Sequence, residues 1–472
     1  MATQPGQTSF SGDTYTDALL WGGWHWTDPA AAPGDPVVVS YFLDTYQGIA
    51  WSAAERASIA QAFQTWSDVA NITFVEVSSA ASAQLIERLV SNNRLPGALG
   101  EHGTPDSAAN GPEFDGTLLL GDNGQSYGYF NYQAFSGGSL GRGGYDFLTF
   151  VHELGHGLGL AHPHDDGGGS GLFPGVAYLN DGDLGSNTLN QGIYTVMSYN
   201  DGWASVQNPV GHGLSRYGYE AGPMAFDIAA IQYLYGANTT AHNGNDVYIL
   251  PAANRTGTAF ECLWDTGGTD SIVFSGRANV RIDLRPATLD NSATGGGVVS
   301  YAKGIYGGFT IANGADIENA SGGRGNDVLT GNELANVLYG NRGNDQLRGS
   351  GGSDTLFGGA GRDNLLGGEG SDTFIFSVGL RDANADRIGD FQTGIDKIYL
   401  NHSIFAQAGA AGNLSSTVFA YGSAADGDDH IIYRPGSGDL IYDSNGRAAG
   451  GTHLIAHLGS NLALTAADFY IF

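Results

Sequence analysis

Apolar and polar residues follow different periods along the chain, and the change of period divides it into two parts. In the first part an amphipathic helix is predicted by apolar residues at helical spacing, namely Phe147, Leu148, Val151, Leu154 and Leu158. Residues 37–43, 52–70 and 71–77 favour a strand, a helix and a strand. From residue 322 a nine-residue period begins, with one large apolar residue in each repeat. The pattern predicts a mixed α and β part followed by short repeated strands.

The nine-residue period covers six consecutive repeats, 322–375, without an insertion. Each repeat begins with Gly, has Asp or Asn at position six and Leu or Phe at position eight. The pattern G-G-x-G-x-D-x-U-x is typical of parallel β-helices that bind Ca²⁺. The residues x-U-x predict a short strand with U in a narrow core, and the glycines allow tight turns with positive φ. One repeat makes half a turn, so neighbouring repeats should lie on opposite sheets.

The position-six residues should form two rows of oxygen ligands. They are Asp327, Asp345 and Asp363 along one edge, and Asn336, Asp354 and Asp372 along the other. Stacked carboxylates repel one another without a cation, and aspartates together with turn carbonyls can supply the six or more oxygens that Ca²⁺ takes. A flexible Gly-Asp linker is the alternative, but the fixed period and the regularly spaced Leu argue against it.

The calcium ligands predicted in the repeats come from the glycine turns and the aspartates. They are Gly323, Gly325, Asp327, Asn341, Gly343, Asp345, Gly352, Asp354, Gly359, Gly361, Asp363, Gly370 and Asp372. The second repeat departs from the pattern, because Asn332 and Leu334 replace glycines and Asn336 replaces aspartate. We therefore expect weaker Ca²⁺ binding there.

The predicted amphipathic helix carries a metal-binding pattern. His152 and His156 are four residues apart, so both imidazoles lie on one face and can share a Zn²⁺ ion. Glu153 is placed to act as general base for a metal-activated water. Gly159 can adopt the left-handed conformation that ends a helix, after which His162 can return as third ligand. The alternative, histidines that fill a core, is an unusual use of three histidines and a glutamate.

A methionine follows the third histidine in the segment YTVMSY, residues 194–199. H-E-x-x-H-x-x-G-x-x-H followed by such a methionine is the metzincin form of the zinc-protease motif. Met197 would lie beneath the zinc site as an apolar floor, a structural role. Tyr199 has two equally weighted interpretations from the sequence, a residue of the zinc site or an ordinary buried tyrosine.

Composition and charge exclude several classes of protein. The 48 acidic and 19 basic residues give a net charge of −29, and residues 1–240 alone hold 23 acidic and 5 basic residues. Such a chain is a poor binder of nucleic acid. The lone Cys262 excludes an intrachain disulfide and a cysteine-based zinc finger. No apolar run reaches about 18 residues, so no membrane span is expected, and residues 1–30 lack the pattern of a standard secretory signal.

On the zinc motif, the methionine turn and the repeats, the chain resembles the serralysins, secreted bacterial zinc metalloproteases with a calcium-binding roll. TDALLWGGWHW, PMAFDIAAIQYLYGAN and DRIGDFQTGIDKIYL also resemble segments of that family. The resemblance implies an α+β metzincin catalytic domain in residues 1–240, with a mixed sheet, helices and zinc on the active-site helix. It implies an all-β domain in residues 241–472, a parallel β-roll or β-sandwich.

The resemblance also implies ligands and roles that spacing alone does not give. Tyr199 would coordinate zinc in the resting enzyme and swing away to stabilise the tetrahedral intermediate. A calcium site at the junction of the domains would be formed by His242, Gly244, Asp246, Asp265, Gly267 and Asp270. The implied cofactors are therefore one catalytic Zn²⁺ and several structural Ca²⁺ ions.

The activity that the resemblance implies is zinc-dependent endoproteolysis of extracellular proteins. The C-terminal DFYIF resembles the uncleaved signal of type I secretion, and a final buried strand is the other interpretation. The family thus implies export by the type I apparatus of a Gram-negative bacterium, a monomer, polypeptide substrates and a small proteinaceous inhibitor. The rival functions are a dedicated processing protease with one native target and a non-enzymatic exported Ca²⁺-binding surface protein.

Three segments depart from the family or leave its cleft undefined. After Pro163 the chain is long and rich in Gly and Asp, and we expect His164 there to be exposed to solvent rather than near the active site. A further calcium site is a candidate at Asp181, Asp183 and Asn187, which have calcium-loop spacing. Residues 84–115 are unlike the family. We expect substrate to lie along an edge strand within residues 116–130 by β-augmentation.

Overall fold

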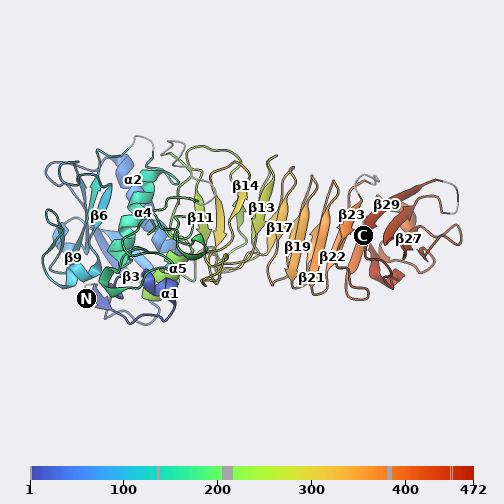
Figure 1. Ribbon diagram of the computed structural model, residues 1–472, viewed down its shortest axis with the longest axis horizontal. Coiled ribbons are helices and arrows are strands. Elements are labelled where there is room, and N and C mark those ends of the chain that lie inside the picture. Colours follow the sequence, from blue (N-terminus) through green and yellow to red (C-terminus); the bar gives the residue numbers. More distant parts are fainter. Residues whose placement is uncertain (1–2, 136–138, 205–215, 380–384, 447, 449) are drawn as a thin grey trace.

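The computed structural model describes residues 3–135, 139–204, 216–379, 385–446, 448 and 450–472. It is an elongated molecule with helices at one end and a long stack of strands leading away from them (Figure 1). Within these residues every α-helix lies in the first half of the chain. The helices are α1 (Thr14–Ala18), α2 (Ala53–Val69), α3 (Pro105–Ala109), α4 (Tyr145–Leu158) and α5 (Ala225–Tyr235).

A seven-stranded mixed sheet supports the helical end of the molecule. Its main path is β4-β3-β5-β9-β8-β7, and β6 pairs with β9 beside it. The strands are β3 (Val37–Asp44), β4 (Ile72–Glu76), β5 (Leu85–Val90), β6 (Gly100–His102), β7 (Glu113–Phe114), β8 (Leu119–Asp122) and β9 (Gln125–Asn131). The predicted strand, helix and strand correspond to β3, α2 and β4. A separate ribbon pairs β1 (Gln4–Gln7) with β2 (Trp24–Thr27).

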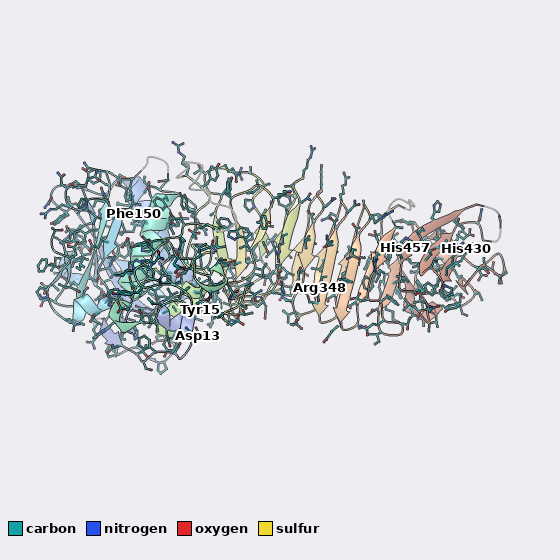
Figure 2. All side chains as sticks on the ribbon, viewed as in Figure 1. Asp13, Tyr15, Phe150, Arg348, His430 and His457 are labelled. Carbon is teal, nitrogen blue, oxygen red and sulfur yellow. The ribbon has the colours of Figure 1, made fainter. Side chains whose placement is uncertain are left out.

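Helix α4 lies across this sheet and packs against α2 in the core. Trp66 of α2 is buried and its indole N–H donates to the carbonyl of Val151, 3.2 Å away. Phe150 is also fully buried, in the helical end of the molecule (Figure 2). The helix ends where the sequence predicts, because Gly159 takes the left-handed conformation with φ +107°.

The second half of the chain forms two long sheets that wind around a common core. One sheet has the order β10 (Val247–Ile249), β12 (Ser271–Val273), β16 (Asn319–Ser321), β18 (Val337–Tyr339), β20 (Thr355–Phe357), β22 (Thr373–Phe376), β24 (Lys397–Leu400), β30 (Phe469–Ile471) and β25 (Gly412–Asn413). The other has the order β11 (Phe260–Leu263), β15 (Gly308–Ile311), β14 (Ser300–Ala302), β13 (Val280–Asp283), β17 (Val328–Thr330), β19 (Gln346–Gly351), β21 (Asn364–Glu369), β23 (Asp386–Ile388), β29 (Thr452–His457), β28 (Asp439–Asp443), β27 (Ile431–Arg434) and β26 (Phe419–Tyr421).

Successive nonapeptides alternate between the two sheets, as the repeat predicts. Leu329 pairs in parallel register with Leu347, 18 residues later, whereas Leu338 pairs with Leu356 on the opposite sheet. The position-eight side chains are at most 1 % exposed, namely Leu329, Leu338, Leu347, Leu356, Leu365 and Phe374. Their neighbours face outward, and Arg348 is exposed on the roll (Figure 2). The C-terminal part of the chain is therefore an all-β, largely parallel structure.

Glycines in the roll have two different functions. Gly361 has φ +145°, and an added Cβ would overlap the carbonyl oxygen of Gly343, so both its conformation and the close approach of the two backbones require glycine. Gly323 and Gly325 serve the other function, because neither lies in the left-handed region. An added Cβ there would instead approach the carbonyls of Gly276 and Ala278, at 2.7 and 2.6 Å.

The final residues form a strand in the roll. Strand β30 pairs in parallel with β24, and its Phe469 and Ile471 are buried. This confirms the interpretation of DFYIF as a buried strand, and its role as a secretion signal stays a prediction. Among the described residues, the helices are all too short or too polar to cross a bilayer.

Leu329→Ala should destabilise the roll strongly, because the side chain is fully buried in a one-residue-wide core. We expect a loss of about 2–5 kcal/mol in the free energy of unfolding. Val328→Ala, on the adjacent and 37 % exposed position of the same strand, should cost less than about 1 kcal/mol. Denaturant unfolding in saturating Ca²⁺ compares the two variants, and equal losses would contradict the inward orientation of Leu329.

Candidate metal and active site

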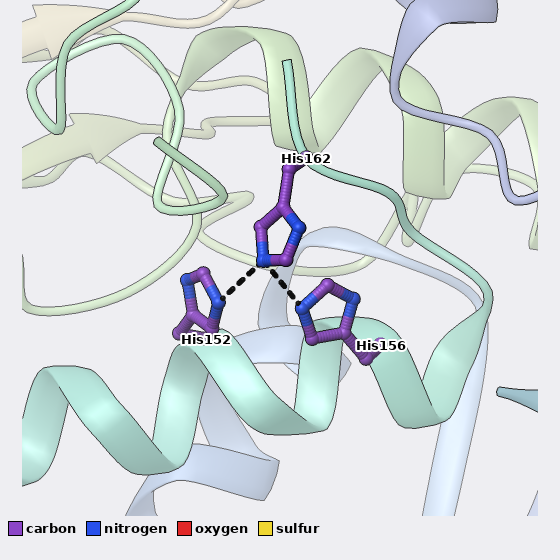
Figure 3. A group of neighbouring side chains, drawn as sticks. All are labelled: His152, His156 and His162. Atoms are coloured by element: carbon purple, nitrogen blue, oxygen red, sulfur yellow. Dashed lines mark hydrogen bonds between the residues drawn. The ribbon is translucent and has the colours of Figure 1, made fainter. Parts of the chain in front are cut away.

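Three histidines converge between helix α4 and the chain that follows it (Figure 3). His152 and His156 lie one turn apart on α4, and His162 returns to them after the turn at Gly159. The Nε2 atom of His162 lies 3.2 Å from Nε2 of His152 and 3.0 Å from Nε2 of His156. Three imidazole nitrogens thus meet at one point, as the spacing of the motif predicts.

The opposite nitrogen of each ring faces an oxygen atom. Nδ1 of His152 lies 2.7 Å from the carbonyl of Val196, and Nδ1 of His156 lies 2.8 Å from the carbonyl of Leu160. Nδ1 of His162 lies 2.6 Å from Oδ2 of Asp165. Each Nδ1 therefore donates its proton, and in neutral rings the three Nε2 lone pairs face one another. This arrangement is repulsive unless a cation lies between the nitrogens, so the donor set fits Zn²⁺.

Burial keeps these rings neutral. It lowers the pKa of His152 to about 4, and it lowers those of His156 and His162 well below the ordinary value. Neighbouring imidazoles lower the pKa values of His156 and His162 further, because like charges disfavour each other. At neutral pH the three Nε2 atoms are therefore electron-pair donors without protons.

Glu153 lies beside the first histidine and against strand β6. Its side chain is 7 % exposed. Burial raises the pKa of its carboxyl to about 8, and His102 opposes this rise. A Cβ added to Gly100 would lie 2.5 Å from Cγ of Glu153, so only glycine at this position leaves the carboxylate where it is. The β6 backbone thus fixes one side of the Glu153 pocket.

Met197 lies underneath the metal-binding turn of α4, as expected of an apolar floor. It is fully buried, and a Cβ on Gly155 would lie 2.7 Å from its sulfur. Helix α5 holds this turn in place through the carboxylate of Asp227, which accepts hydrogen bonds from Thr195 Oγ1 (2.6 Å) and Val196 N (2.7 Å).

Tyr199 and His164 both lie beside the three converging histidines. For His164 this differs from the sequence expectation of a solvent-exposed side chain. Tyr199 is 51 % exposed, with its ring centre 4.7 Å from that of His162 and 5.6 Å from that of His152, so it is not an ordinary buried tyrosine. His164 was expected in solvent, but it is 6 % exposed and stacks on His162 at 5.0 Å. The segment after Pro163 therefore keeps His164 buried beside His162.

A cavity of about 350 Å³ adjoins the histidines and Glu153. Its walls come from residues 97–100, from α4 and from residues 196–201. The strand that borders it is β6, which corrects the expectation of an edge strand within residues 116–130. In that range β9 is paired on both sides, and β8 lies between β9 and β7. In the antiparallel pair of β6 with β9, the Gly100–Phe130 pair is the non-hydrogen-bonded one, so the Gly100 backbone groups face away from β9.

The roll aspartates form two ladders along the edges of the sheets. The backbone N–H of Asp345 donates to Oδ1 of Asp363 at 2.8 Å, and that of Asp354 donates to Oδ1 of Asp372 at 2.9 Å. The other oxygen, Oδ2, is buried without a hydrogen-bond partner in the part of the chain that the structure describes, for Asp345, Asp354, Asp363 and Asp372. Buried unpartnered carboxylate oxygens beside glycine-turn carbonyls fit Ca²⁺.

The ladders extend beyond the nonapeptides. Asp363 N donates to Oδ1 of Asp386 and Asp372 N to Oδ1 of Asp396, both at 3.0 Å. Sequence reasoning missed these two residues, because they follow their partners by 23 and 24 residues instead of 18. The motifs DRI and DKI, each an aspartate before a strand, were the available signal.

The acidic residues assigned to the junction calcium site also come together. Carboxylate oxygens of Asp246, Asp265 and Asp270 lie within 4.8 Å of one another. Burial raises the pKa of Asp270 to about 6, and the neighbouring carboxylates contribute to the rise. The backbones at Gly244 and Gly268 approach closely, since a Cβ on Gly268 would overlap the Gly244 carbonyl. The predicted carbonyl ligands of His242, Gly244 and Gly267 stay predictions.

The additional calcium site proposed after Pro163 is not assembled. Asp183 accepts hydrogen bonds from the backbone of Ala177 and Gly185, within its own turn. The amide of Asn187 donates instead to Asn291, 104 residues away. Side chains that are turned to different partners do not form one cation site, so the calcium-loop spacing was misleading here.

Without calcium, the roll should become less stable as the pH rises. Burial and neighbouring carboxylates raise the pKa of Asp345 and Asp354 from 3.8 to about 7. The folded roll therefore binds protons that the unfolded chain has released between about pH 4 and 7, and stability is lost across this range as pH increases. Hydrogen exchange of residues 319–376 in EDTA should show higher opening free energies at pH 5 than at pH 8.

The same hydrogen-exchange measurement in millimolar Ca²⁺ should give higher opening free energies at pH 8 than at pH 5, because Ca²⁺ binds the deprotonated carboxylates. An opening free energy that rises with pH in EDTA would contradict the burial of these groups.

Comparisons with known proteins identify the relatives of this chain. The family model described as Peptidase M10 serralysin C terminal matches residues 226–414. Serralysin of Proteus mirabilis is 38 % identical over 393 residues, which are 78 % of this chain and 74 % of that protein. Metallopeptidase AprA of Pseudomonas marginalis is 34 % identical over 301 residues, 61 % of this chain and 56 % of that protein.

Two further relatives match smaller parts of this chain. Serralysin B of Dickeya chrysanthemi is 37 % identical over 276 residues, 56 % of this chain and 51 % of that protein. The chain thus spans about half the length of this relative and of AprA. The solution structure of the AlgE6R3 subunit of the Azotobacter vinelandii mannuronan C5-epimerase is 32 % identical over 31 % of this chain and 78 % of that chain, with a TM-score of 0.23. From the extent of the match to the Proteus mirabilis protein, the chain belongs to the serralysin family of metallopeptidases.

Proposed function

We propose that this protein is a zinc-dependent endopeptidase that hydrolyses peptide bonds of extracellular proteins. The observation that carries the proposal is the convergence of three Nε2 atoms, each with its Nδ1 proton donated away, beside the buried carboxyl of Glu153. The bordering strand and the adjoining cavity supply a place for an extended polypeptide. The names of the related metallopeptidases support the same activity.

His152, His156 and His162 would hold the zinc ion, with Tyr199 beside them as a fourth protein ligand in the resting state. Bound zinc would supply a Lewis acid at this point of the cleft. Asp165 orients His162 through Nδ1 and increases the basicity of its other nitrogen. The carbonyls of Val196 and Leu160 orient the other two rings in the same way.

Glu153 would transfer the protons in the reaction. Its carboxylate takes a proton from the attacking water and passes it to the leaving amine, the two tasks of one general acid and base. The pocket between α4 and Gly100 holds the carboxyl in one position and excludes most of the solvent from it. The hydroxyl of Tyr199 would donate a hydrogen bond to the developing oxyanion.

Strand β6 would orient the substrate. Because the Gly100 backbone N–H and C=O face away from β9, an extended peptide can pair with them as an additional strand. Such a strand would run between β6 and residues 196–199, across the groups that react. The edge is short and glycine-containing, which leaves room for the backbone of a substrate close to Glu153.

The second part of the proposal concerns the two domains and the secretion of the protein. We assign residues 1–240 to the catalytic domain and residues 241–472 to a Ca²⁺-binding roll. The roll carboxylates lack counter-charges until Ca²⁺ binds, so the roll would fold fully only where calcium is plentiful, as it is outside the cell. This supports secretion, with type I export as the proposed route.

Glu153→Ala should abolish proteolysis and leave the metal site intact. The variant removes the proton-transfer group, which contributes about 100- to 10,000-fold to such reactions. Casein hydrolysis measures the loss, while metal analysis should still find one zinc ion per chain. Glu113→Ala, an exposed glutamate on β7, is the control that should keep normal activity. Near-normal casein hydrolysis by Glu153→Ala would refute the assignment.

Gly100→Ala should reduce kcat with little change in zinc content. The added methyl group would displace the Glu153 carboxyl, and a misplacement of about 1 Å costs on the order of 100-fold in rate. Gly171→Ala is a matched control, since nothing lies within 4 Å of its added Cβ. A fluorogenic peptide assay compares the two, and an unchanged kcat for Gly100→Ala would show that β6 does not position Glu153.

A further inference from the structure

The cavity beside the histidines continues well beyond the reacting groups. It begins at His152 and Glu153 and reaches Tyr145, the first residue of α4. Tyr145 lies seven residues before His152, about 10 Å along the helix axis at 1.5 Å per residue. A cavity of about 350 Å³ with this extent can hold a long side chain of a substrate as well as its backbone.

The walls of this cavity are apolar along much of their length. Leu99 and Ala98 contribute from the segment before β6, Leu148 from α4 and Val196 from the turn above Met197. The aliphatic part of a lysine or arginine side chain packs well on such walls and leaves its charged end to find a polar partner.

Asp201 provides that partner. It lines the cavity together with Tyr145, whose hydroxyl donates a hydrogen bond to the Asp201 carboxylate. The bond ties Asp201 to the first turn of α4, the end of the cavity away from His152. Glu220 is completely buried and adds a second carboxyl group close to Asp201.

The part of the cavity wall that the structure describes offers no basic side chain to pair with these carboxyls. The described residues that line the cavity include no lysine or arginine. The first 240 residues contain five arginines and no lysine. Three of the five pair with acidic residues elsewhere, Arg56 with Glu76, Arg88 with Asp44 and Arg142 with Glu261. The cleft therefore presents the Asp201 carboxyl, without a basic partner among the described wall residues, at the end of an apolar channel.

We propose that this cavity selects a lysine or arginine side chain next to the scissile bond, and that Asp201 is the residue that determines this specificity. The inference rests on the proposed endopeptidase function. A guanidinium or ammonium group at Asp201 would make a charge-assisted hydrogen bond in a partly desolvated site, where such bonds are strongest. Peptides with a neutral or acidic side chain at that position would leave Asp201 without a counter-charge.

Cleavage profiling of a diverse peptide library by the full-length, zinc- and calcium-loaded protein tests this specificity. We expect Lys and Arg to be enriched at one position flanking the cleaved bonds. In Asp201→Asn and Asp201→Ala, kcat/KM for such peptides should fall by about 10- to 100-fold, the equivalent of one charge-assisted hydrogen bond. Hydrolysis of peptides with neutral residues at that position should change little, which also shows that the variants are folded.

Asp35→Asn is the matched control, because it removes one negative charge from an exposed position outside the cavity walls. It should keep the preference of the parent protein. Cleavage without enrichment of Lys or Arg, or an unchanged preference in both Asp201 variants, would overturn the role of Asp201 while leaving the endopeptidase function standing. A parent protein that cleaves no peptide in the library would overturn the proposed function itself.

Discussion

Repulsion between electron-rich atoms that the fold brings together determines the chemistry of both halves of the protein. At one end Nε2 of His162 lies 3.2 Å from that of His152 and 3.0 Å from that of His156, and each Nδ1 proton is donated to an oxygen. Along the roll, Oδ2 atoms of successive aspartates are buried without hydrogen-bond partners in the described part of the chain. Neither arrangement is favourable by itself, and a cation relieves both. In the proposed function, the fold would therefore reach its stable functional form only with cations bound at both places.

Glycines next to these sites leave the space that the site residues and the neighbouring backbone occupy. Gly100 leaves room for the Glu153 carboxyl, and Gly155 leaves room for the sulfur of Met197. In the roll, Gly361 allows the backbone to approach Gly343 and to take φ +145°. These glycines act through close contact between neighbouring elements, so the high glycine content is a packing requirement of the sites as much as a source of turns.

How far the sequence predicts the structure depends on how local the controlling interactions are. The helix at α4, its end at Gly159 and the alternation of repeats follow from spacing within 18 residues, and all three were predicted correctly. The burial of His164 and the identity of β6 as the bordering strand were missed, because they depend on which distant segments pack together. Asn187 shows the same limit, since its partner, Asn291, lies in the other half of the chain. Local spacing therefore predicts which atoms can bind a metal, whereas the shape of the cleft depends on tertiary contacts.

Acidic residues have different roles in the roll and in the first 240 residues. In the roll, carboxylates are spaced for cations, and the ladders give each one a place beside the next. In residues 1–240, the proposed zinc site would use only Glu153 and Asp165, so most of the acidic residues there would have no metal to bind. Where an acidic residue lines an apolar channel, as at Asp201, our proposal is that its basic partner comes from the polypeptide that enters the channel. A polypeptide with a basic side chain would satisfy both the apolar walls and the Asp201 carboxyl, and the proposed specificity would then join the acidity of residues 1–240 to the choice of substrate.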